Sequence, residues 1–143
     1  MSGCWVGGSN GHVPEGAIRV GHDKDGGPIF IGRAYFGSDI LPAKIIPHHG
    51  AAYVPHGGQE HPVYNYEVLC NGQAMWQNAS DGDVPPNALH VGTTQNGELL
   101  YVGRVLHDGT LTPGKVQPSH GVCYIPYDGM EIPYKQYEVL IMN

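Results

Sequence analysis

Residues 32–55 read GRAYFGSDILPAKIIPHHGAAYVP, and residues 103–126 repeat the pattern as GRVLHDGTLTPGKVQPSHGVCYIP. The second stretch begins 71 residues after the first, and the same offset places Trp5 on Trp76 with no insertion or deletion. Across residues 5–69 and their partners, 25 of the 65 paired positions are identical. The chain is therefore a tandem duplication, and each feature of one copy can be compared with the other.

Retained glycines and prolines dominate the identities between the two copies. They fix backbone dihedral angles, so both copies should turn at the same places. The retained pairs include Gly11/Gly82, Pro14/Pro85, Gly21/Gly92, Gly26/Gly97, Gly32/Gly103, Pro42/Pro113, Pro47/Pro118, Gly50/Gly121 and Pro55/Pro126. A repeat of this length is marginal for a core of its own. We therefore expect a first repeat at residues 1–71 and a second at 72–143, folded together as one intertwined globular unit.

Short apolar runs separated by glycine and proline predict an all-β protein of short antiparallel strands. The clearest run is residues 29–35, in which Ile29 and Ile31 alternate with Phe30 and Gly32. No window of about 11 residues or more carries an apolar stripe with the helical period. The expected fold therefore consists of strands and turns.

The junction between the copies predicts how they connect. Asn71-Gly72 lies between two apolar segments, which is typical of a two-residue hairpin. We expect the last strand of the first copy to pair with the first strand of the second. By symmetry, the N- and C-terminal strands should pair and close the fold around a pseudo-twofold axis and one shared core.

Charge and apolar content exclude several classes of partner. The formal net charge is −6 and the seven basic residues are scattered singly, so we expect no nucleic-acid binding. No run approaches the roughly 18 apolar residues of a membrane span, so we expect no membrane insertion. Residues 1–16 lack the features of a secretory signal, which predicts a cytoplasmic protein released, if at all, by a leaderless route. Cys4, Cys70 and Cys123 have no metal-type spacing and are expected to be reduced thiols.

No catalytic or metal motif stands out, so we expect neither an enzyme, nor a cofactor, nor a metal site. The chain has no Gly-x-Ser-x-Gly sequence and no phosphate-binding glycine loop. The turn at Asp23 resembles the start of an EF-hand loop, but Pro28 and Ala34 stand where glycine and a bidentate acid are needed. Of nine histidines, only His49 and His120 are matched, and we expect the histidines to be surface or turn residues.

Eight charged residues occupy matched positions and are either structural ion pairs or repeated sites. They are Arg33/Arg104, Lys44/Lys115, Glu60/Glu131 and Glu67/Glu138. Arg33 lies on an apolar strand face and needs an acceptor, for which Glu67 is the natural candidate. Arg104 and Glu138 should repeat that pair. Lys44 and Lys115 each follow a retained proline, and we expect them to point to solvent or into a cleft, as ordinary surface lysines or as functional groups.

Five phrases, taken in order, resemble the DM-nine repeat family, which also provides the lectin module of natterin-like proteins. The phrases are His12-Val13-Pro14, Val20-Gly21-His22-Asp23, Ile31-Gly32-Arg33-Ala34, Leu41-Pro42-Ala43-Lys44 and Tyr66-Glu67-Val68-Leu69. The resemblance covers the chain as two tandem repeats. It implies a non-catalytic, mannose-binding lectin of β structure, commonly a homodimer, with a pattern-recognition role in invertebrate innate immunity.

The resemblance also implies site residues. In this family, an aspartate after Gly-His and the lysine after Leu-Pro-Ala contact the sugar, which assigns carbohydrate-binding roles to Asp23 and Lys44. The second copy retains Lys115 but has Thr94 in place of the aspartate, so it would use a neutral acceptor such as Asn96. We expect Lys44→Ala to abolish mannose binding while leaving the melting temperature nearly unchanged.

An acid and an amine are suited to a sugar because the carboxylate accepts from neighbouring hydroxyls while the ammonium donates to their oxygens. Each such charged hydrogen bond contributes about 1.5–3 kcal/mol, so a single sugar should bind weakly and two sites should add avidity. The alternative is an intracellular protein-interaction or stress-response scaffold whose sugar site is vestigial. A glycan array, with and without chelator, would separate the two.

Overall fold

The computed structural model describes residues 2–142 and confirms an all-β fold. The first repeat contains β1 (Ser2–Ser9), β2 (Arg19–His22), β3 (Pro28–Phe36), β4 (Asp39–Ile46), β5 (Ala51–His56), β6 (Gln59–Val63) and β7 (Asn65–Gly72). The second contains β8 (Ala74–Ser80), β9 (His90–Thr93), β10 (Leu99–His107), β11 (Thr110–Gln117), β12 (Val122–Tyr127), β13 (Met130–Tyr134) and β14 (Gln136–Met142). Two 3-10 turns, η1 (Pro47–His49) and η2 (Pro118–His120), complete the elements. Within residues 2–142, no helix has the length and apolar character needed to span a membrane.

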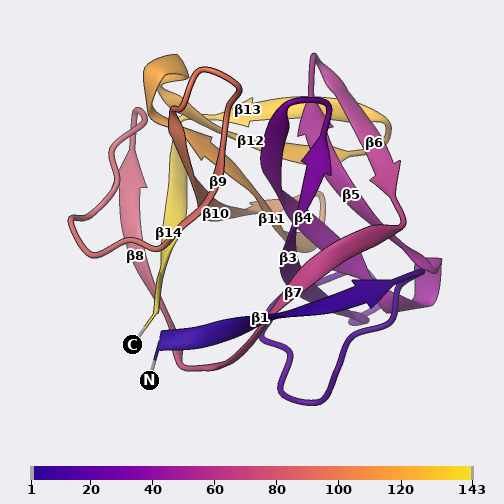
Figure 1. The fold of residues 1–143 in the computed structure, drawn as a ribbon. Coiled ribbons are helices and arrows are strands. Elements are labelled where there is room, and N and C mark those ends of the chain that lie inside the picture. The colour runs from indigo at the N-terminus through magenta and orange to yellow at the C-terminus, as the bar shows by residue number, and fades with distance from the viewer. Residues whose placement is uncertain (1, 143) are drawn as a thin grey trace.

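The two repeats exchange strands and close one antiparallel sheet on itself (Figure 1). β2 pairs with β11 of the second repeat at His22 and Leu111, and β9 pairs with β4 of the first at Thr93 and Ile40. These contacts are equivalent under the 71-residue offset, as a pseudo-twofold arrangement requires. The pairings complete a ring in the order β3, β2, β11, β10, β9 and β4. Each repeat therefore supplies part of the other's sheet.

Two retained glycines allow this exchange. A Cβ on Gly21 would collide with the carbonyl oxygen of Leu111, and a Cβ on Gly92 would collide with the carbonyl oxygen of Ile40. Backbones of different repeats approach each other closely at these crossings, which only a residue without a side chain permits.

The predicted pairing at the junction and at the termini is wrong in detail. β7 pairs with β1 and β14 pairs with β8, so each repeat joins its own first and last strands. On its other edge, β7 is paired with β3, and the amide of Asn71 donates to the carbonyl of Gly16. Both edges of β7 are thus occupied, and β8 cannot add there. The termini do lie close together (Figure 1), where a Cβ on Gly3 would come within 2.8 Å of Met142 Cε.

Three clusters of buried apolar side chains fill the fold. The central cluster is the expected shared core, because both repeats contribute to it. Its members are Ile18, Val20, Ile29, Ile31, Ile46, Leu69, Val91, Val102 and Leu140. Each repeat adds a second cluster at equivalent positions, such as Ile45 and Val54 in the first and Val116 and Ile125 in the second.

The hairpins β5–β6 and β12–β13 meet across the pseudo-twofold axis, and both contribute residues to the cavity described below. Met130 pairs with Gln59, and two glutamates fasten the contact. Glu131 accepts from the amide of Gly58, and Glu60 accepts from the amide of Gly129, each at 3.0 Å. The tip of one repeat is thereby held against the other.

Candidate functional site

Lys44 lies in the middle of β4, between Ile31 of β3 and Tyr53 of β5. Its exposed fraction is only 4%, so the expectation that it points to solvent is wrong. It points instead into a cavity, which was the other expectation. The β12–β13 hairpin of the second repeat covers this face of β4, and Lys44 contacts Pro126 there. This cover cannot be predicted when each repeat is considered by itself.

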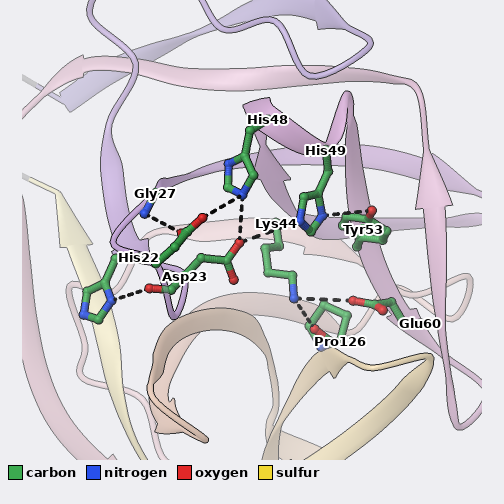
Figure 2. Close-up of polar contacts among 10 residues, drawn as sticks. His22, Asp23, Gly27, Lys44, His48, His49, Tyr53, Glu60 and Pro126 are labelled. Atoms are coloured by element: carbon green, nitrogen blue, oxygen red, sulfur yellow. Dashed lines mark hydrogen bonds and ion pairs between the residues drawn. The ribbon is translucent and has the colours of Figure 1, made fainter.

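The Lys44 ammonium is held by groups from both repeats (Figure 2). It donates to the carbonyl oxygen of Pro126 and forms an ion pair with Glu60 Oε2 at 3.4 Å. The rings of Tyr53 and Tyr127 lie 5.7 and 5.4 Å from the nitrogen. These two rings flank the cation at distances typical of cation–π contacts.

Burial and charge act in opposite directions on Lys44. Burial lowers the pKa of the Lys44 ammonium below its ordinary value, while the charges of Glu60 and Asp23 raise it. The net shift is downward. An ammonium in this environment gains more from a ligand oxygen than one in water, because the surroundings screen the interaction less.

Asp23 begins the turn between β2 and β3. The turn is closed by backbone bonds in which the Asp23 amide donates to Gly27 and the Gly26 amide donates to Asp23. The carboxylate is 21% exposed, and its Oδ2 atom lies 3.3 Å from His48 Nε2 and 3.8 Å from His49 Nε2. The sequence predicted no metal site, but these three residues place their ligand atoms within 4.8 Å of one another.

Asp23 and Lys44 line the same cavity, as the family resemblance implied. The cavity has a volume of about 390 Å³, within the range of small-ligand sites. At its rim, Lys24 of the first repeat and Asp108 of the second form an exposed ion pair of 2.7 Å. The complete lining is Asp23, Lys24, Lys44, Ile46, His49, Tyr53, Glu60, Asp108, Tyr127 and Asp128.

This lining suits a compact ligand with many hydroxyl groups. Asp23 offers acceptors, and two of the three N–H bonds of Lys44 are engaged by Pro126 and Glu60, which leaves one for a ligand. Tyr53 and Tyr127 add ring surfaces against which the C–H side of a sugar can pack.

The second repeat does not reproduce this site. Lys115 is 5% exposed, and its ammonium lies 2.9 Å from Glu131 Oε2 as an ion pair. Asn96 lines a different cavity of about 620 Å³, and Lys115 is not among the described residues around that cavity. Two carboxylates line this cavity, Glu98 of the second repeat and Asp39 of the first, and Asp39 accepts from the amide of Gln95 at 2.7 Å. Lys115 and Asn96 are therefore not brought together.

The matched charges form four ion pairs. Arg33 Nε lies 2.8 Å from Glu67 Oε1 and Arg104 Nε lies 2.9 Å from Glu138 Oε1, which confirms the two predicted pairs. The remaining matched charges are the pairs of Lys44 and Lys115 described above. Sequence reasoning missed Glu60 as the partner of Lys44, although Glu60 and Glu131 were the only matched acids left. It also missed the retained Tyr53/Tyr124 pair, one member of which lies in the cavity wall.

A duplicated, closed antiparallel sheet with a polar cavity between its repeats defines the class as an all-β tandem-repeat module. The sequence matches the DM9 repeat over residues 1–37 and 23–134. The chain belongs to the DM9 repeat family, as its sequence phrases indicated.

Similar proteins support the family and the fold. Natterin-3 and Natterin-4 of Thalassophryne nattereri are 29% identical over 137 residues and 27% identical over 138 residues. The alignments cover 93% and 94% of this chain but 34% and 33% of the relatives, so the chain spans about a third of their length. The nematode sperm cell motility protein MFP2B has a TM-score of 0.71, with 100% of this chain and 48% of that chain covered. At 14% sequence identity, this likeness shows the fold alone.

Proposed function

We propose that this chain is a non-catalytic lectin that binds mannose-type glycans in the cavity of Asp23 and Lys44. The observation that carries the proposal is that these two residues, 21 positions apart, line one cavity together with two tyrosines. The carboxylate accepts from two adjacent sugar hydroxyls while the ammonium donates to one of their oxygens. The proposal includes no reaction.

A site with so few charged contacts should bind one sugar weakly. Three charged hydrogen bonds of about 1.5 kcal/mol each, the low end of their range, give about 4.5 kcal/mol, which corresponds to a Kd of about 0.5 mM. Useful strength on a glycan-coated surface would then come from several sites on one particle. The proposal therefore includes a homodimer and a role in innate immune recognition of microbial surfaces. The proposal also includes a cytoplasmic location.

The two repeats should contribute unequally. Asp23 has Thr94 as its counterpart, and Lys115 is engaged by Glu131. We assign the main site to the first repeat, with the cavity of Asn96 as a weaker second site that lacks an ammonium. An intracellular scaffold that binds protein, with neither cavity accepting sugar, is the competing function.

Isothermal titration of the full chain with methyl α-mannoside, in the presence of chelator, tests the proposal. Asp23→Asn keeps the shape of the side chain but removes its charge, and it should weaken binding more than about tenfold because a charged hydrogen bond is lost. Thr94→Ala is the matched control at the equivalent turn of the second repeat and should leave the main affinity unchanged.

Two outcomes would contradict the lectin proposal. One is a wild-type protein that gives no heat with mannoside at tens of millimolar and no signal on a glycan array, which favours the scaffold. The other is equal affinity of the wild type and Asp23→Asn for mannoside, which would show that the sugar binds outside this cavity.

A further inference from the structure

The turn at Asp23 also faces two histidines, His48 and His49, and His49 lines the same cavity as Lys44 (Figure 2). His48 and His49 are adjacent residues at the end of η1, and both direct Nε2 toward Asp23 Oδ2. The pair is fixed by retained backbone features, because Pro47 starts the 3-10 turn and Gly50 ends it with a left-handed φ of 70°. Two imidazoles and one carboxylate are thus presented to one point.

The spacing of these atoms suits a transition-metal ion. A tetrahedral ion with bonds of about 2.0–2.2 Å holds its ligand atoms about 3.3 Å apart. Asp23 Oδ2 and His48 Nε2 are already 3.3 Å apart, and His49 Nε2 lies 3.8 Å from the same oxygen. Asp25 Oδ2 lies 3.9 Å from His48 Nε2 and offers a further oxygen. Small rotations of half-exposed side chains are enough to close the set.

The surroundings orient both imidazoles. His49 Nδ1 is 3.2 Å from the Tyr53 hydroxyl, the kind of outer contact that directs the opposite nitrogen of a metal-binding histidine. The His48 ring lies against Gly27, where a Cβ would come within 2.7 Å of the ring. Gly27 therefore leaves room for the ring, and the Gly27 amide holds Asp25 through a 2.9 Å hydrogen bond.

The second repeat shows what this turn looks like without the histidine pair. His48 is replaced by Ser119, and Gly27 is replaced by Glu98. Glu98 there accepts from the Ser119 hydroxyl at 2.7 Å and from the Ser119 amide at 2.8 Å. The second repeat thus fills the same space with an internal hydrogen-bonded pair, whereas the first repeat leaves Asp23 and two imidazoles facing one another.

We propose that Asp23, His48 and His49 bind one divalent transition-metal ion of the zinc class, with at least one coordination position open to the cavity. Imidazole nitrogen favours Zn²⁺, Cu²⁺ and Ni²⁺, whereas Ca²⁺ requires six or more oxygen ligands, so the site should discriminate against calcium. Each imidazole would coordinate through the lone pair of Nε2 with its ring proton on Nδ1, and the Nδ1–H of His49 would donate to the Tyr53 oxygen.

The metal site goes beyond the sugar site but shares Asp23 and His49 with the cavity lining. Asp23 cannot give the same oxygen to a metal and a hydroxyl, so Zn²⁺ and mannoside should affect each other's affinity. His48 is not part of the cavity lining, so His48→Ala separates the two activities. Asp23→Asn should weaken both.

Titration calorimetry with ZnCl2 alone, on the chelator-treated full chain without sugar, tests the inference, with CaCl2 as the comparison ion. We expect one Zn²⁺ per chain and no calcium signal. His48→Ala and His49→Ala should each weaken zinc binding more than about tenfold, since even loss of an outer-shell partner costs about 10–100-fold. His120→Ala, which removes the matched histidine of η2, should leave zinc affinity unchanged. The absorption spectrum of bound Co²⁺ gives an independent reading of nitrogen ligation.

Absence of zinc binding by the wild-type chain would overturn the inference. So would a His48→Ala variant that binds zinc as tightly as His120→Ala does, because the ion would then lie at another histidine. His48 and His49 are about 42% and 41% exposed, so both variants should keep the wild-type circular dichroism spectrum. A failed zinc titration leaves the sugar proposal standing, and a failed mannoside titration leaves this one standing.

Discussion

Lys44 shows how one side chain serves the fold and the cavity together. Its ammonium joins Glu60 of the first repeat to Pro126 of the second while it faces the cavity beside Asp23. Lys115 forms the equivalent ion pair with Glu131 but does not line the cavity that contains Asn96. The structural ion pair is therefore sufficient to explain why both copies retain this lysine. A buried charge that loses its partner is costly, which ties binding to stability at this position.

Replacing Lys44 should destabilise the protein, contrary to the expectation from the sequence. Lys44→Met keeps the bulk of the side chain but leaves the Glu60 carboxylate, 14% exposed, without its counter-charge. Loss of one partner of a buried pair costs about 3–5 kcal/mol, and the partial exposure of Glu60 favours the lower figure of about 3 kcal/mol. Urea unfolding gives the value, and Lys24→Met, which breaks the exposed pair with Asp108, is the control that should unfold like the wild type. A Lys44→Met protein as stable as that control would show that the buried pair contributes nothing.

The matched tyrosines should make stability depend on alkaline pH. Burial raises the pKa of Tyr137 to about 12, and the hydroxyl donates to the Asp83 carbonyl at 2.9 Å. In the unfolded chain a tyrosine ionises near pH 10. The folded state therefore keeps a proton that the unfolded state loses, so this contribution is complete below about pH 10 and is lost between pH 10 and 12.

Tyr137→Phe should reduce the loss of stability at high pH. It should cost about 1 kcal/mol at pH 8 through the lost hydrogen bond. Between pH 9 and 11, its unfolding free energy should fall by up to about 1.4 kcal/mol less than that of the wild type. The counterpart Tyr66 donates to the His12 carbonyl and its pKa is also raised by burial, so Tyr66→Phe should act in the same direction. Parallel pH curves for Tyr137→Phe and the wild type would exclude this role.

At the scale of elements, the sequence predicted strands and local pairs well and long-range pairing poorly. Arg33 and Glu67 were identified as partners because a charge on an apolar strand face needs an acceptor, and both occur again in the second copy. The Asn71-Gly72 hairpin was wrong because local turn preference is outweighed when both edges of β7 are occupied by other strands. The strand exchange explains why both copies retain glycine at Gly21 and Gly92. The close approach of two backbones, which requires glycine at these positions, is visible only in the folded chain.

The exchange predicts that Gly21→Ala is strongly destabilising. The added methyl group collides with the Leu111 carbonyl in a strand of the other repeat, where no flexible side chain can yield. We expect a loss of at least about 3 kcal/mol in urea unfolding, at the upper end of overpacking costs. Gly7→Ala is the control, because Gly7 is an exposed residue of β1 and no atom lies within 4 Å of the new Cβ. A Gly21→Ala protein within about 1 kcal/mol of Gly7→Ala would mean that β2 and β11 are not tightly paired.

At the scale of the whole molecule, the duplication supplies what one repeat cannot. Tyr127 and Asp108 of the second repeat complete the cavity around Asp23 and Lys44 of the first. The family resemblance supplied Asp23 and Lys44 from the sequence, whereas the opposite wall depends on contacts between residues more than 80 positions apart, such as Lys44 with Pro126. The two cavities are lined by different residues, although the two repeats have the same fold. We therefore expect the two cavities to differ in what they bind.

The most direct test of the central claim is a ¹H–¹⁵N correlation spectrum of the full chain recorded during titration with methyl α-mannoside. The lectin account predicts dose-dependent amide shifts concentrated at Asp23, Lys44, Tyr53 and Tyr127, with smaller shifts around Asn96. A spectrum that does not change at tens of millimolar mannoside, or shifts that avoid the cavity between the repeats, would contradict it.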